Sequence, residues 1–198
     1  MPDRPDSDVR DTPAPPLHIR DARPDEIGAI RRLTVGAYAE YAATMPAALW
    51  RAYRKAIVRT LDGQGPVQRI VAELDGEGPV GTVLLFAPSA AAYGQAADGA
   101  SWPEVRLLAV RPQVRGRGVG ATLMEACARR ACLAGAGAVG LHTMDVMEAA
   151  VRLYDRLGYV RTPERDFSPL PGVVVKGYRL DLDGCPPASA GGRKARPR

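Results

Sequence analysis

The sequence contains no long apolar run, and none of its apolar stretches approaches the roughly 20 residues that a membrane-spanning helix requires. Its first sixteen residues, MPDRPDSDVRDTPAPP, also lack the apolar core of a signal peptide. These two absences predict a protein that has no membrane partner and is located in the cytoplasm.

Cysteine and histidine are scarce, with three and two residues respectively. Cys127 and Cys132 fall on different faces of one predicted helix, and an odd total argues against a disulfide framework. His18 and His142 are far apart, so no Cys/His cluster has the spacing of a zinc site. We therefore expect no metal.

The 198 residues are 46% hydrophobic and 25% charged, which is typical of one soluble globular domain. Residues 1–16 and 184–198 are too polar and too rich in proline or basic residues to form a core, so we expect flexible ends around a domain over 17–183. The net charge of +5 is concentrated at residues 115–117 and in the basic tail from 193 to 198. This distribution favours a local anion site over a nucleic-acid surface.

The spacing of apolar residues predicts an alternation of strands and helices between the two ends. Strands are predicted over 17–21, 69–74, 80–86, 104–110, 138–143, 159–162 and 173–181, and helices from about 23 to 41 and over 46–62, 118–134 and 147–157. The strand-helix-strand unit over 104–143 has the size of a parallel crossover, whereas 69–86 reads as an antiparallel hairpin. Residues 88–101 have no clear period and are predicted to form a mobile loop. The pattern indicates a mixed α/β sheet.

The segment from Arg115 to Gly120 is compatible with three structures. Its glycines would let the backbone approach an anion at the start of the following helix. Gly116, Gly118 and Ala121 also match the dinucleotide fingerprint G-x-G-x-x-G/A, but five residues separate the strand from the first glycine, which is too long a turn. The third alternative is a simple connection with its arginines in solvent.

Two motifs favour the anion site. The sequence Leu108-Ala109-Val110-x-Pro112-x-x-Arg115-Gly116-Arg117-Gly118-Val119-Gly120 closely resembles the central motif Q/R-x-x-G-x-G/A of the GNAT superfamily of N-acetyltransferases. A second segment, Ala150-x-x-Leu153-Tyr154-x-x-Leu157-Gly158-Tyr159, resembles the later A-x-x-L-Y-x-x-x-G-F/Y motif of that family. The resemblance covers most of residues 17–182. It implies a mixed, mostly antiparallel sheet of six to seven strands, flanked by helices, with a central parallel strand pair.

The resemblance also implies acetyl-CoA as co-substrate, with its pantetheine arm along the central strand and its pyrophosphate at the start of the next helix. The residues expected to bind it are Leu108, Ala109, Val110, Arg115, Gly116, Arg117, Gly118, Val119, Gly120, Ala121 and Thr122.

For catalysis, the resemblance implies that Tyr154 donates a proton to the departing CoA thiolate, although it could instead be a core tyrosine. Glu104 is the candidate base, acting through water, and its alternative is a strand-edge glutamate in solvent. His142 is a second candidate base. Met147 stands where the family often has an asparagine, which puts one amide contact to the cofactor in doubt.

The acceptor is expected to be a primary amine, either on a small molecule or on a protein. The helical region 27–61, with Tyr38, Glu40, Tyr41 and Trp50, and the loop 88–101 should shape its pocket. A non-catalytic acyl-CoA-binding regulatory module, or nucleic-acid binding through the basic loop and tail, would be alternatives. The sequence identifies neither the amine nor whether the protein is a monomer or a homodimer.

Overall fold

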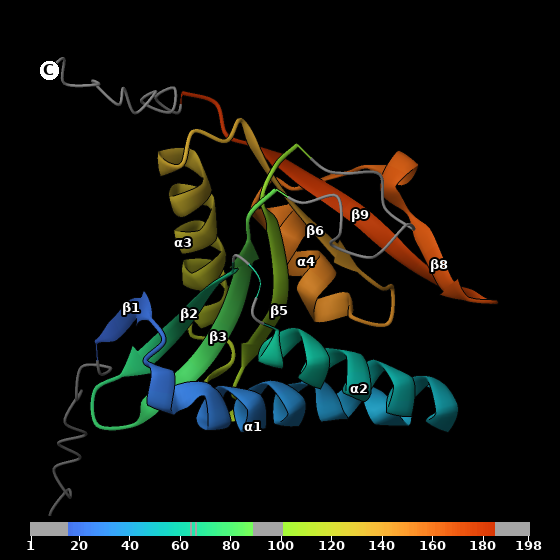
Figure 1. Cartoon of the computed structure of the whole chain (residues 1–198), viewed down its shortest axis with the longest axis horizontal. Helices are drawn as coiled ribbons and strands as arrows, with labels where there is room; N and C mark the ends of the chain where they lie inside the picture. Colours follow the sequence, from blue (N-terminus) through green and yellow to red (C-terminus); the bar gives the residue numbers. More distant parts are fainter. Residues whose placement is uncertain (1–15, 64, 66, 89–100, 185–198) are drawn as a thin grey trace, which may run out of the picture.

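The computed structural model describes residues 16–63, 65, 67–88 and 101–184. Almost all of the two ends that the sequence predicts to be flexible, and almost all of the predicted loop over 88–101, lie outside these residues. The described part contains eight strands and four α-helices joined by short turns (Figure 1).

The strands form a single sheet in the order β1-β2-β3-β5-β6-β9-β7, with β8 paired to β9. Their bounds are Leu17–Asp21 (β1), Val67–Leu74 (β2), Gly78–Phe86 (β3), Glu104–Val110 (β5), Ala138–Thr143 (β6), Val160–Arg161 (β7), Phe167–Leu170 (β8) and Val173–Asp181 (β9). Among the strands of the described ranges, only β5 and β6 are parallel, and the other pairs are antiparallel. The predicted fold is therefore confirmed. The strand that the sequence pattern misses is β8, which lies in a segment predicted to be a connection.

The four helices are α1 (Ile27–Tyr38), α2 (Ala47–Asp62), α3 (Val119–Leu133) and α4 (Glu148–Arg156), and the 3-10 turns η1 (Pro24–Glu26) and η2 (Ala39–Ala43) flank α1. In Figure 1, α1 and α2 lie side by side across the lower part of the view. The predicted first helix is thus shorter than expected, because Ala39 to Ala43 winds as a 3-10 turn.

Alternate residues of the strands point to opposite faces of the sheet, where they belong to two different hydrophobic clusters. Ile70 of β2 packs with α3 residues such as Leu123, whereas the next residue, Val71, packs with Ile30 of α1 and Ile57 of α2. This period of two is the geometry of a strand that is buried on both faces. The sheet is therefore enclosed between the helix pair α1–α2 and α3 on the opposite face.

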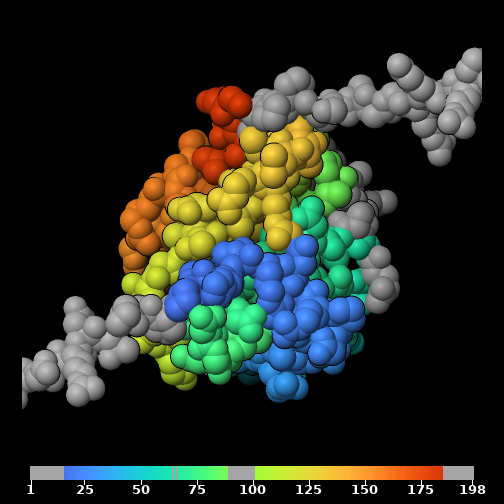
Figure 2. Space-filling view, turned by 90° about the vertical axis from the view of Figure 1, so that its left-hand side faces the viewer, coloured from blue at the N-terminus to red at the C-terminus, as the bar shows by residue number. Residues whose placement is uncertain are grey.

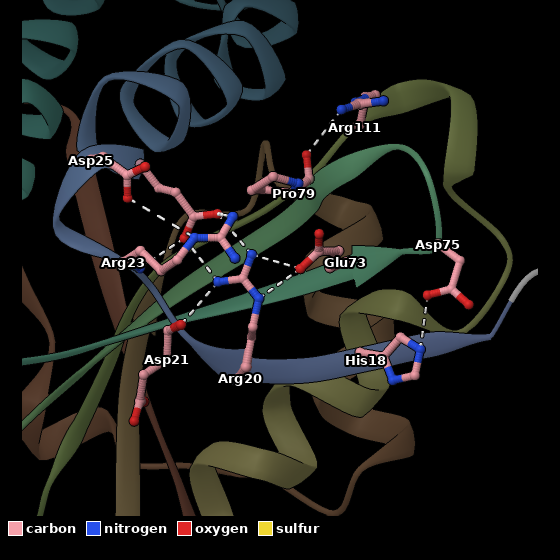
Figure 3. A network of polar contacts seen from close by, with 10 residues as sticks. His18, Arg20, Asp21, Arg23, Asp25, Glu73, Asp75, Pro79 and Arg111 are labelled. Atoms are coloured by element: carbon pink, nitrogen blue, oxygen red, sulfur yellow. Dashed lines mark hydrogen bonds and ion pairs between the residues drawn. The ribbon is translucent and has the colours of Figure 1, made fainter.

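A polar network fastens the start of α1 to the strands beside it. Glu26 accepts hydrogen bonds from Arg20 and from the backbone N–H of Arg23, and Arg20 also donates to Glu73 of β2. Figure 3 shows Arg20, Arg23 and Glu73 converging beside β1. Because Glu26 is buried, this network determines where the chain turns from β1 into α1.

Segments far apart in the sequence meet at the β1 edge of the molecule. Figure 2 shows β1 in blue between the β2–β3 hairpin in green and α3 in yellow. The odd number of cysteines argued against a disulfide framework; Cys127 of α3 is buried and free, but Cys132 is disulfide-bonded.

The described helices include none that is both long and apolar enough to cross a membrane. No group of three or more His, Cys, Asp or Glu side chains within the same described ranges is arranged to hold a metal ion.

Candidate active site

The central strands β5 and β6 pair over only a short length and then diverge. Their parallel register joins Glu104 to Gly140 and Val105 to Leu141, and no further pair follows. Beyond Val105, β5 is hydrogen-bonded as a strand only to β3 among the described residues. The edge of β5 that faces β6 is therefore open from Arg106 to Val110, and its peptide groups, apart from the Val110 carbonyl that accepts from Arg115, are available to an extended ligand.

A bulge on β5 accompanies this divergence. The register between β3 and β5 shifts between Thr82 and Leu84, which face Ala109 and Arg106 respectively. Within the bulge, Leu107 has a φ of 52°, a left-handed conformation that is uncommon for a residue with a side chain. Such strain is maintained only where the surrounding structure enforces it.

A cavity of about 720 Å³ lies along this open edge. Its walls come from β5, the loop that follows it, the start of α3, α4, and the region from α1 to α2. Nine of the eleven predicted cofactor-binding residues line it: Leu108, Ala109, Val110, Arg115, Gly116, Gly118, Val119, Gly120 and Ala121. Arg117 and Thr122 do not, although Thr122 lies in the same helical turn.

The start of α3 presents free peptide N–H groups. The first hydrogen bond of the helix runs from Thr122 N–H to Gly118 carbonyl, and no side chain caps the helix. The N–H groups of Val119, Gly120 and Ala121 therefore have no acceptor within the helix. Together with the positive end of the helix dipole, they make this terminus suited to an anion.

Close packing holds that helix terminus in place. A Cβ added to Gly81 of β3 would lie 2.9 Å from Val119 Cγ1 and 3.0 Å from Leu123 Cδ1. A Cβ on Gly120 would lie 3.3 Å from Leu153 Cδ2 of α4. Gly118 itself adopts a φ of 80°, which favours glycine. The glycines thus bring α3 close to the sheet and turn the chain into the helix.

The two arginines of the loop have different surroundings. Arg115 Nη1 donates to Glu40 Oε2 at 2.6 Å, while its Nη2 donates to the Ala37 carbonyl and its Nε to the Val110 carbonyl, both at 3.3 Å. Arg117 is exposed and forms no hydrogen bond or ion pair with the residues that the structure describes. The predicted contact of Arg115 with phosphate therefore has a competing partner in Glu40.

Tyr154 lies in α4 and lines the cavity. Its side chain is 7% exposed and its ring packs against Tyr159 and Tyr178, at centroid distances of 5.8 and 6.3 Å. Burial, and to a lesser extent the neighbouring Tyr41 and Cys127, raises the pKa of Tyr154 above its ordinary value of 10. The phenol therefore keeps its proton at neutral pH and can act as a hydrogen-bond donor in the cavity.

Glu104 is buried, so the alternative of a solvent-exposed strand-edge glutamate is wrong. Its Oε1 is 3.3 Å from Arg106 Nε and 3.2 Å from His142 Nδ1. His142 Nε2 is 3.0 Å from the carbonyl oxygen of Arg165, so both ring nitrogens of His142 have a polar neighbour. Arg106 and His142 line the cavity but Glu104 does not, so Glu104 lies behind these two side chains.

Aromatic side chains of the α1–α2 region form the opposite wall. Tyr38, Tyr41 and Tyr53 line the cavity, and Tyr38 lies 5.9 Å from each of the other two rings. Trp50 does not line it but packs against Tyr53 at 6.5 Å. Tyr53 falls within the region 27–61 that was expected to shape the acceptor pocket but was not singled out there, and only its aromatic character could have suggested a place in the site.

Met147 precedes α4 and is buried against the cavity. Thr143 Oγ1 lies 3.6 Å from its sulfur. An apolar side chain thus occupies the place where the family often has an asparagine.

Solved structures of similar fold include an acetyltransferase of the GNAT family from Streptococcus agalactiae, with a TM-score of 0.63 and 20% identity over 83% of this chain and 95% of that one. A Salmonella typhimurium protein determined with its cofactor acetyl-CoA has a TM-score of 0.57 and 20% identity over 88% and 98%. A GNAT family acetyltransferase from Brucella melitensis in complex with acetyl-CoA has a TM-score of 0.53 and 20% identity over 86% and 91%. At these identities the likeness concerns the fold.

A comparison with curated proteins gives no match. The sequence itself matches the model of the acetyltransferase (GNAT) family over residues 30–159, well over half of its length and across both motifs and the whole cavity-forming region. The chain therefore belongs to the acetyltransferase (GNAT) family.

Proposed function

We propose that this protein transfers an acetyl group from acetyl-CoA to a primary amine, which attacks the thioester directly in a ternary complex. The observation that carries the proposal is a single cavity in which the open edge of β5 leads to the uncapped start of α3. An open strand edge matches the amide groups of pantetheine, and a helix terminus matches the diphosphate. Two proteins of similar fold were determined with acetyl-CoA.

In this proposal, the peptide groups of Leu108 to Val110 pair with the pantetheine amides. The N–H groups of Val119, Gly120 and Ala121 bind the diphosphate, and Arg115 and Arg117 supply positive charge. Most of these interactions use the backbone. Their strength therefore depends on the position of β5 and α3 more than on the side chains.

The reaction forms a C–N bond and breaks the C–S bond of the thioester. The amine must lose a proton, and the departing sulfur is a better leaving group when it receives one. Tyr154 is the proposed proton donor to sulfur. Its buried environment supports that role because the phenol stays protonated until the transfer.

Glu104 is the proposed base, and its burial behind His142 and Arg106 implies that it acts through an intervening group. A water between Glu104 and the amine would carry the proton. His142, which lines the cavity, is the alternative base. Its two ring nitrogens already lie near Glu104 and the Arg165 carbonyl, so direct action would require the ring to turn.

Met147 supports a second candidate function, a regulatory module that binds acyl-CoA without turnover. The buried methionine cannot provide the amide contact that an asparagine would. Such a module would still use the β5 edge and the start of α3.

Two experiments test these functions. Calorimetry with acetyl-CoA, CoA, NAD and ATP should give binding of the two coenzyme A species and none of NAD. Release of CoA should then be assayed with a panel of amines for the wild type, Tyr154→Phe and the control Tyr178→Phe, whose ring packs on Tyr154 but does not line the cavity. We expect Tyr154→Phe to lower kcat about 100-fold with unchanged affinity for CoA, and Tyr178→Phe to retain activity. Binding without turnover on every amine would favour the regulatory module.

A further inference from the structure

Arg115 connects three separate parts of the protein at the cavity. Its three nitrogen atoms donate to the carboxylate of Glu40, to the carbonyl of Ala37 and to the carbonyl of Val110. We refer to these four residues as the Arg115 clasp. A guanidinium has five N–H groups, so this arrangement leaves two of them for any other ligand.

The residues of the Arg115 clasp come from both walls of the cavity. Ala37 lies in the last turn of α1, where carbonyl groups have no N–H donor within the α-helix and attract a cation. Glu40 lies in η2, and Val110 ends β5. All four residues of the clasp line the cavity, together with the free N–H groups at the start of α3. The clasp therefore bridges the proposed diphosphate site and the arm α1–η2.

The charges of the Arg115 clasp oppose the binding of a second anion. Glu40 lies 2.6 Å from Arg115 and neutralises it, while both side chains remain partly exposed, at 44% and 38%. A diphosphate at the start of α3 would bring at least two negative charges towards the same region. Phosphate oxygens accept hydrogen bonds from a guanidinium in the same forked geometry as a carboxylate. The two anions are thus alternative partners for one side chain.

We propose that Glu40 competes with the diphosphate of coenzyme A for Arg115, so that cofactor binding exchanges this ion pair and releases Glu40 together with η2. The inference rests on the proposed function, because it requires coenzyme A at the start of α3. Glu40 acts as a positioning residue, since it affects the cofactor through Arg115 and not by touching it.

The exchange links the cofactor to the opposite wall of the cavity. Glu40 directly precedes Tyr41 in the chain, so its carboxylate lies near the aromatic wall; burial, and after it Glu40, raises the pKa of Tyr41 above its ordinary value. Release of Glu40 therefore frees a carboxylate beside Tyr38 and Tyr41. Cofactor binding changes the charge of the acceptor side before the amine arrives.

The test is a double-mutant cycle in the affinity for CoA, measured by calorimetry at low salt on the full chain. Glu40→Gln removes the competitor and should lower the Kd for CoA about two- to fivefold, the range expected for a partly exposed ion pair. In an Arg115→Gln background, the same substitution should leave the Kd unchanged. Glu40→Asp keeps the charge but shortens the side chain, and should also lower the Kd.

Glu77→Gln is the matched control. Glu77 is equally exposed at 44% and pairs with Arg111 at 3.3 Å, but neither residue lines the cavity. This variant changes the net charge by the same amount as Glu40→Gln and should bind CoA like the wild type. Its result separates the local ion pair from the overall charge of the protein.

Three results would overturn the inference while leaving the proposed function intact. A weaker or unchanged affinity in Glu40→Gln would mean that Glu40 holds Arg115 for the phosphates or does not interfere with them. A gain that persists without Arg115 would mean that only long-range charge is involved, as would a Kd for Glu40→Asp that equals that of the wild type. If the wild type does not bind CoA at all, the proposed function and this inference both fail.

Discussion

Replacing Glu26 with glutamine should destabilise the fold strongly at neutral pH and weakly in acid. Glu26 is 6% exposed and accepts hydrogen bonds from both terminal nitrogens of Arg20, at 2.8 and 2.7 Å, and from the N–H of Arg23 at 2.7 Å. Figure 3 shows how Arg20 reaches from β1 towards Glu73 and the first turn beyond Arg23. The guanidinium group of Arg23 also pairs with Glu26, at 2.7 Å. Glutamine can accept part of these hydrogen bonds but leaves the guanidinium groups of Arg20 and Arg23 without their shared counter-ion.

The magnitude follows from the pKa of Glu26. The hydrogen bonds from Arg20, followed by those from Arg23, lower that pKa from 4.5 to about 2 despite burial. Since one unit corresponds to about 1.4 kcal/mol, the ionised carboxylate contributes about 3 kcal/mol to the free energy of unfolding. The folded pKa lies below the unfolded one, so this stabilisation is complete above about pH 4.5 and is lost as the pH falls towards 2.

Urea unfolding of the wild type and Glu26→Gln at several pH values would measure this difference. We expect Glu26→Gln to lower the free energy of unfolding by about 2–3 kcal/mol at pH 7, and we expect this difference from the wild type to shrink by about 2 kcal/mol between pH 7 and pH 3. The control Glu148→Gln removes an exposed pair with Arg152 and should change stability by less than about 0.5 kcal/mol. A difference below about 1 kcal/mol at pH 7, or one that does not vary with pH, would refute the reasoning.

Four other substitutions test the packing around the site and in α1. Tyr159→Phe should leave stability unchanged or raise it by about 1 kcal/mol in urea unfolding, because the buried hydroxyl has no hydrogen-bond partner among the described residues; a clear loss would reveal a missed partner. Gly118→Ala should lower the free energy of unfolding by about 1–2 kcal/mol, because the φ of Gly118 is 80°. It should also weaken CoA binding in calorimetry, and an unchanged Kd would argue against a diphosphate at this turn. Gly81→Ala should lower the free energy of unfolding by about 1–3 kcal/mol and also weaken CoA binding, because its Cβ would press on Val119. Gly36→Ala in α1 meets open space and should raise the free energy of unfolding by about 0.5–1 kcal/mol. Equal effects at Gly81 and Gly36 would contradict this explanation.

Local patterns in the sequence were sufficient to predict most elements and most of the residues that line the cavity along β5 and the start of α3. The bounds of β1 and β5 match their predictions, as does the end of α2 at Asp62 before Gly63. These elements are recognisable because the spacing of apolar residues identifies a helix or strand, and glycine or proline marks where it ends, within a few residues of sequence. The turn from Arg115 to Gly120 was equally readable, since the positive φ angles of Gly116 and Gly118 are ones that glycine permits.

Features that depend on contacts between residues far apart in the sequence could not be predicted from local patterns. The short strand β8 contains Pro169 and becomes a strand because it pairs with β9. The place of Glu104 was also ambiguous, because its sequence context is the same for an exposed strand end and for a buried one. Its burial results from the packing of Arg106 and His142 around it.

The sequence by itself determined the fold class, the order of the elements and the glycine-rich turn that begins α3, since each depends on conformational preferences of neighbouring residues. Only the tertiary structure decided that β5 and β6 diverge after two residue pairs, that Leu107 adopts a left-handed bulge, and that Arg115 meets Glu40 from 75 positions away. The physical reason is that strand register and side-chain partners are selected by the packing of the whole core, where a residue's neighbours in space are set by elements that are remote in the chain.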